Sequence, residues 1–160
     1  MKIDLALREL HRSETELAED LLRLSERHGT DHEIHHLARD LAAWSVDHVR
    51  RIAEIGARYG LDLDPDPVHD AGLTKRVRER AAEAVGRSGP PELALLRDLR
   101  HVYLSAQGVS VDWELLGQAA QGIRHHDLIA LTQRCHPENL RQATWANSRL
   151  KESATQILVS

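Results

Sequence analysis

Apolar residues recur along the first sixty positions with the alternating three- and four-residue spacing of helices that are buried along one side. The first series comprises Ile3, Leu7, Leu10, Leu17, Leu21 and Leu24, and the second comprises Ile34, Leu41, Val49, Ile52, Ile55 and Tyr59. Gly29 separates the two series, and Thr30 and Glu33 have the spacing of a capping box, which predicts that Thr30 caps the second helix. The pattern predicts helices over 3–28 and 31–60 that form an antiparallel hairpin.

The rest of the chain predicts a long connection and a second hairpin. Residues 61–110 begin with a loop rich in proline and aspartate, and two shorter helices are expected at 73–87 and 92–107. After Gly108, apolar spacing predicts a long helix over 111–135, and His136-Pro137 is expected to begin a last helix over 137–158. We therefore expect a single all-α domain over 1–160, in which two antiparallel hairpins joined by a long crossover form a four-helix bundle.

Composition supports helices and excludes several classes of protein. Aromatic residues make up 3% of the chain and Phe is absent, which favours packing of helices over a sheet. The net charge is −4 with acids and bases interleaved, so no basic surface for nucleic acid is expected. No apolar run approaches the length of a membrane span, no signal peptide is recognisable and Cys135 is the single cysteine, all of which favours a cytoplasmic protein.

Two ionisable residues interrupt the apolar stripes of the first hairpin. Glu14 and His48 both fall at positions that the helical spacing places inside the bundle. An unpaired buried carboxylate costs several kcal/mol, so Glu14 needs a partner, and His48 is expected in the same layer. The position of the turn predicts that Ser45 faces Glu14 and that His11 faces His48. In the second hairpin, His126 and Asp127 border the apolar stripe, and Asn147 is expected opposite His126.

These residues resemble the ferritin-like superfamily of di-iron carboxylate bundles. That superfamily places Glu on the first helix, Glu-x-x-His on the second, an acid on the third and Glu-x-x-His on the fourth. The corresponding residues of this chain are Glu14, Ser45-x-x-His48, Asp127 and Thr144-x-x-Asn147. The resemblance implies a ferritin-like bundle with a degenerate metal centre. Since two irons need bridging carboxylates, the alternatives are a metal-free hydrogen-bond network or a single Fe or Zn ion. The candidate ligands for that ion are Glu14, His48, His11, His126 and Asp127.

A separate cluster of histidines surrounds the first turn. His28, His32, His35 and His36 are expected mostly at solvent positions. His32 and His36 are four residues apart, so an alternative is a zinc ion held by this pair with Glu33 or His28.

The sequence favours a non-enzymatic binding or assembly protein that carries no cofactor and forms a homodimer. Gly117, Ala119, Ala120 and Gly122 give one helix a side of small residues, which suits either an internal contact with a tryptophan or a dimer interface. One alternative function is metal storage or redox chemistry at Glu14 and His48. Another is a small-molecule carrier, which would need a closed apolar pocket near Trp44. Cys135 is expected to be inert, because no third group orients the adjacent His136.

Overall fold

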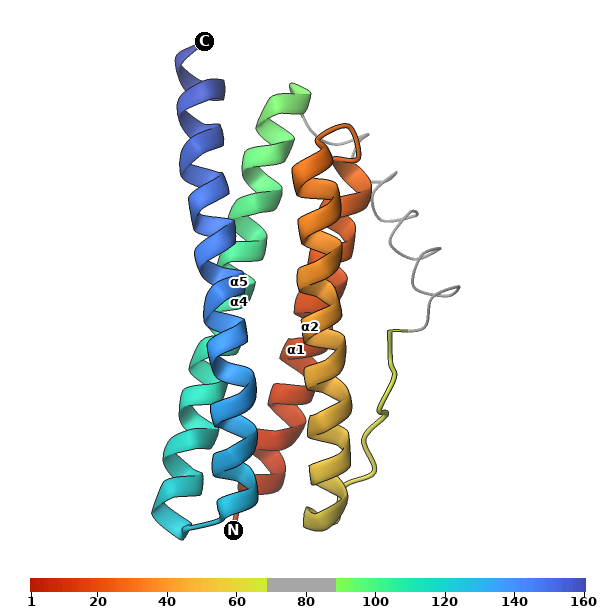
Figure 1. The fold of residues 1–160 in the computed structure, drawn as a ribbon, viewed down its shortest axis with the longest axis vertical. Coiled ribbons are helices and arrows are strands. Elements are labelled where there is room, and N and C mark those ends of the chain that lie inside the picture. The colour runs from red at the N-terminus through yellow and green to blue at the C-terminus, as the bar shows by residue number, and fades with distance from the viewer. Residues whose placement is uncertain (69–88) are drawn as a thin grey trace.

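Four long α-helices and one short 3-10 helix form a bundle in the computed structural model, which describes residues 1–68 and 89–160 (Figure 1). The helices are α1 (Ile3–Arg27), α2 (His32–Gly56), η1 (Ala57–Tyr59), α4 (Pro91–Ile123) and α5 (His126–Val159). No strand occurs in the described residues. The all-α class and the four-helix count expected from the sequence are confirmed. None of the described helices combines the length and apolarity that crossing a membrane requires.

The first hairpin has the predicted bounds to within a few residues, but its cap differs. Asp31, not Thr30, is the N-cap of α2, and its carboxylate accepts a hydrogen bond from the Ile34 amide at 3.1 Å. Glu33 does not reach back to the cap, because its carboxylate accepts from Arg149 of α5 at 3.3 Å. The helix starts at His32, so the residue directly before it supplies the capping oxygen.

The second hairpin corrects the predicted bounds. α4 continues through Gly108, and α5 continues through Pro137, so residues 92–107 belong to a bundle helix and not to a crossover. Both residues are exposed. A helical glycine costs about 1 kcal/mol and a proline about 3 kcal/mol, and the apolar stripes on both sides outweigh these costs. The actual turn is at Arg124, in the left-handed conformation (φ 56°), and His125. The helix predicted at 73–87 lies outside the described residues.

Contacts at the two ends of the bundle establish the direction of each helix. Asp98, early in α4, accepts hydrogen bonds from Arg27 and His28 at the turn between α1 and α2. At the opposite end, the Tyr59 hydroxyl lies 2.9 Å from Nδ1 of His125, in the turn between α4 and α5. α2 and α4 therefore run in the same direction, and the connection between them starts and finishes at opposite ends of the bundle (Figure 1).

Candidate functional site: a buried polar layer

Polar side chains from all four bundle helices meet inside the apolar core. Nδ1 of His48 on α2 lies 2.9 Å from Oε1 of Glu14 on α1. The same oxygen accepts a hydrogen bond of 2.8 Å from the indole nitrogen of Trp113 on α4. Nε2 of His48 lies 3.2 Å from Oε1 of Glu138 on α5. Glu14, His48 and Trp113 are completely buried, whereas the Glu138 side chain is 20% exposed.

This geometry favours a charged imidazolium. Burial by itself lowers the pKa of His48, but the hydrogen bonds and negative charges of Glu14 and Glu138 outweigh it, so the pKa is raised above its usual value. When protonated, both ring nitrogens donate, one to each carboxylate. The layer is then a carboxylate–imidazolium–carboxylate triad, in which the two acids come from helices on different sides of α2.

Neighbouring amides extend the polar layer along α5. The Gln142 side-chain nitrogen donates to the Ser45 hydroxyl at 2.9 Å and to the Leu41 carbonyl at 2.8 Å. One turn earlier, the Asn139 amide donates to the Ala106 carbonyl at 3.2 Å. These bonds tie α5 to α2 and to α4, and Ser45 therefore pairs with Gln142 and not, as predicted, with Glu14.

Of the five candidate ligands, the structure brings two together and places the other three elsewhere. The expected contact between Glu14 and His48 is present. His11 points to the connection after α2, where its Nε2 lies 2.7 Å from the Asp64 carbonyl. His126 is exposed, and Asp127 accepts from the Tyr59 hydroxyl at 3.1 and 3.2 Å at the end of the bundle. The predicted grouping of His11, His126 and Asp127 with the Glu14–His48 pair is therefore wrong, because α5 begins eleven residues earlier than expected and the sequence does not show where the His11 ring turns.

Four members of the layer were not predicted as site residues: Trp113, Glu138, Asn139 and Gln142. Reading 126–159 as one helix would have revealed the α5 part, because its inward series contains two amides. That series is Leu128, Leu131, Cys135, Asn139, Gln142 and Ala146. Pro137 concealed it by suggesting a helix start in the middle of the series.

The layer does not fit a di-iron centre. Trp113 donates a hydrogen bond to Glu14 from α4, and an indole N–H cannot ligate a metal ion. Glu138 lies on Nε2 of His48, on the far side of the imidazole from Glu14, so the two carboxylates cannot bridge a pair of ions. Within the described residues, no three His, Cys, Asp or Glu side chains are arranged to hold a metal ion. One feature suits a single cation: Oε2 of Glu14 is buried without a hydrogen-bond partner.

Cys135 is buried on α5, and burial raises the pKa of its thiol to about 12. It therefore stays protonated at neutral pH, as expected for an inert cysteine. Nε2 of the adjacent His136 lies 2.9 Å from the Ser110 hydroxyl, which occupies that imidazole nitrogen.

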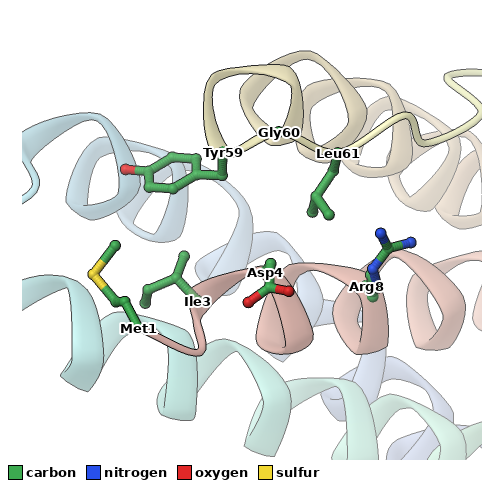
Figure 2. Close-up of a pocket in the computed structure, with 7 residues that line it drawn as sticks. All are labelled: Met1, Ile3, Asp4, Arg8, Tyr59, Gly60 and Leu61. Atoms are coloured by element: carbon green, nitrogen blue, oxygen red, sulfur yellow. The ribbon is translucent and has the colours of Figure 1, made fainter.

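A shallow cleft of about 330 Å³ lies where the start of α1 meets the end of η1 and the two residues that follow it (Figure 2). Asp4 and Arg8 supply its charged groups, and Ile3 and Leu61 supply apolar walls. Tyr59 borders the cleft, but its hydroxyl bonds to Asp127. The cleft gathers no set of groups with an evident shared chemistry.

Comparison of the chain with protein-family models, with curated proteins and with solved structures found no match in any of the three. The functional interpretation therefore depends on the geometry of this chain.

Proposed function

We propose that this protein is a non-catalytic, ferritin-like bundle that works by assembly, as a homodimer formed through the outer face of α4. The closed hydrogen bonding of His48 between two carboxylates supports a layer that fixes helix packing without chemistry. The parallel course of α2 and α4, joined by a long connection, supports the ferritin-like assignment.

The observation that carries the proposal is an uncharged apolar stripe on α4. Leu104, Val111 and Leu115 are 49%, 52% and 62% exposed, and Gly108 lies between them on the same side of the helix. Glu114 is the only charged residue among the exposed positions from 104 to 122. Contiguous apolar surface of this kind favours burial against a partner.

The stripe has a spacing that is symmetric about its own centre. Leu104, Gly108, Val111 and Leu115 follow one another at intervals of four, three and four residues. In an antiparallel pair of α4 helices, a two-fold axis at the centre places Leu104 against Leu115 of the second copy, and Gly108 against Val111. A two-fold interface requires this reciprocal matching, and a second copy is therefore the occupant that we propose.

The charges on α4 agree with that two-fold arrangement. The same two-fold axis places Glu114 opposite Ser105 and Asp112 opposite Gln107, so no like charges on α4 face each other. Of the four small residues that suit either an internal contact with a tryptophan or a dimer interface, Gly122 is exposed and Ala119 is half-buried. Gly117 and Ala120 are buried, and a Cβ on Gly117 would meet Thr132 of α5 at 3.0 Å. At Gly117, α4 therefore makes a close internal contact with α5.

Sedimentation equilibrium of the full chain tests the proposal. We expect a dimer for the native chain and a monomer for Leu104→Glu and for Leu115→Lys, each of which buries a charge in the interface. The double variant should dimerise again, because the two-fold axis brings the two introduced charges of opposite sign together. Leu158→Lys is the matched control, since Leu158 is 65% exposed but lies outside the stripe. A monomeric native chain at 100 μM, or a double variant that stays monomeric, contradicts the proposed interface.

A second candidate function is the binding of one Fe or Zn ion at Glu14 and His48, and the unpartnered Oε2 of Glu14 favours it. Metal at Nδ1 would require loss of the proton shared with Glu14, while Glu138 would orient the imidazole from Nε2. Elemental analysis after incubation with Fe²⁺ or Zn²⁺ tests this site. Metal retained by the native chain and lost from a Glu14→Gln, His48→Gln variant supports it, and equal metal content in the two contradicts it.

A further inference from the structure

Of the four histidines around the first turn, two have hydrogen-bond partners and two have none in the part of the chain that the structure describes. Nε2 of His28 lies 2.7 Å from Oδ2 of Asp98, and Nδ1 of His35 lies 3.1 Å from the Ser25 hydroxyl. His32 and His36 are exposed, and within the described residues neither imidazole has a hydrogen-bond partner. In this second pair, both nitrogens of each ring are available for a ligand from solution.

His32 and His36 are positioned to act on the same ligand. They are four residues apart in the first turns of α2, so their side chains lie one above the other on one side of the helix. Their ring centroids are 6.4 Å apart, and the ring planes differ by only 13°. Two parallel imidazoles at this spacing can turn their nitrogens toward one ion without a change in the backbone.

We propose that His32 and His36 form a surface chelate for a single divalent transition-metal ion, with water in the remaining coordination positions. Neutral imidazole suits Cu²⁺, Ni²⁺ and Zn²⁺, and Cu²⁺ binds most tightly among the divalent ions of this series. No third His, Cys, Asp or Glu of the described residues completes the site. The site is therefore open and exchangeable, and it is separate from the Glu14–His48 layer.

The same stretch, His32-Glu33-Ile34-His35-His36, has the spelling of the His-Glu-x-x-His motif of zinc hydrolases. In that motif Glu is the general base for a metal-bound water. Here the Glu33 carboxylate is paired with Arg149 at 3.3 Å, and a third protein ligand is lacking among the described residues. The arrangement supports metal binding and gives no support to hydrolysis.

Titration of the tag-free full chain with CuCl₂ and with ZnCl₂, followed by calorimetry, tests the site. We expect one ion per chain, bound more tightly for Cu²⁺. The affinity should fall by about tenfold or more in His36→Ala, since one of two linked ligands is lost. His126→Ala is the matched control, because it removes an exposed histidine from another helix and should leave the affinity unchanged.

Two further variants make the test specific for geometry and location. The double variant His36→Ala, Asp40→His keeps the number of histidines but moves the second imidazole to the eighth position after His32, and it should bind as weakly as His36→Ala. His48→Gln should bind as tightly as the native chain. Native affinity in His36→Ala, or recovery of affinity in the Asp40→His double variant, would overturn the proposed chelate.

Discussion

His48 and Glu14 form a hydrogen-bonded pair of 2.9 Å in which neither side chain has any exposed surface. The pair joins α1 to α2, and Trp113 and Glu138 connect it to α4 and α5. Each buried ionisable group thus has its compensation on another helix. The hydrogen bonds of the layer therefore form only when the four helices are packed together, and losing these bonds should weaken that packing.

Removing both partners of this pair should cost less unfolding free energy than the sum of the two single removals. His48→Leu leaves the Glu14 carboxylate buried with Trp113 as its remaining partner, and breaking a buried pair in this way costs about 3–5 kcal/mol of unfolding free energy. The double variant Glu14→Leu, His48→Leu leaves neither charge, so its cost should be smaller than the sum of the two single costs by about 1–3 kcal/mol. Urea unfolding measures all three variants. Additive costs would show that the two groups are not energetically coupled.

The stability of the protein should fall as the pH rises above neutrality. The folded pKa of His48 is raised, so the native state holds its proton more tightly than the unfolded chain does. The resulting stabilisation is complete below the unfolded pKa of about 6.5 and is lost as the pH rises through the folded pKa. Urea unfolding at pH values from 6 to 9 should show this loss in the native chain and not in His48→Gln.

A second histidine requires a control in the same experiment. The pKa of His101 is also raised, chiefly by its hydrogen bond to Asp20, but this imidazole is exposed and its contribution is screened by solvent. His101→Gln should therefore retain most of the pH dependence. A flat profile in His101→Gln would assign the effect to the surface pair instead of the buried layer.

The sequence predicted the first hairpin and its buried pair, because every inward position of α1 and α2 agrees with one helical period. Glu14 and His48 were visible as the ionisable exceptions in those stripes. In the second hairpin, Gly108 and Pro137 suggested interruptions that the structure does not contain. The turn of the second hairpin was therefore predicted at the wrong residues, and every pairing predicted between its two helices was shifted. For this reason Glu138 was missed and Asp127 was included. Local breaker residues are weak signals when both flanking segments share an apolar stripe.

Replacing Pro137 in α5 should stabilise the protein. It is exposed inside the helix, and its ring removes the amide that would donate to the Gln133 carbonyl. Pro137→Ala restores that donor, and the gain should exceed the conformational entropy returned to the unfolded chain, so unfolding free energy should increase by about 1–2 kcal/mol. Urea unfolding checks this value. A loss of stability would mean that the proline sets a bend on which the packing of Glu138 depends.

Gly108 and Gly117 should respond in opposite ways to the same substitution. A Cβ on Gly108 would meet nothing within 4 Å, so Gly108→Ala should stabilise α4 by about 1 kcal/mol. A Cβ on Gly117 would lie 3.0 Å from Cγ2 of Thr132, and overpacking of this kind costs about 1–3 kcal/mol. Gly117→Ala should therefore be less stable than Gly108→Ala by at least about 1 kcal/mol. Both are measured by urea unfolding in the Leu115→Lys background, which removes the proposed dimer.

A substitution at Thr132 tests whether its methyl group causes the difference between Gly117→Ala and Gly108→Ala. Thr132→Ser removes Cγ2 but keeps the hydroxyl that donates to the Leu128 carbonyl at 3.0 Å. If the methyl contact limits the approach of α4 and α5, Gly117→Ala combined with Thr132→Ser should be more stable than Gly117→Ala alone. Thr132→Ser should give Gly108→Ala no such gain, since that glycine faces outward. Equal effects of Thr132→Ser on both alanine variants would show that the close approach at Gly117 does not determine how the second hairpin packs.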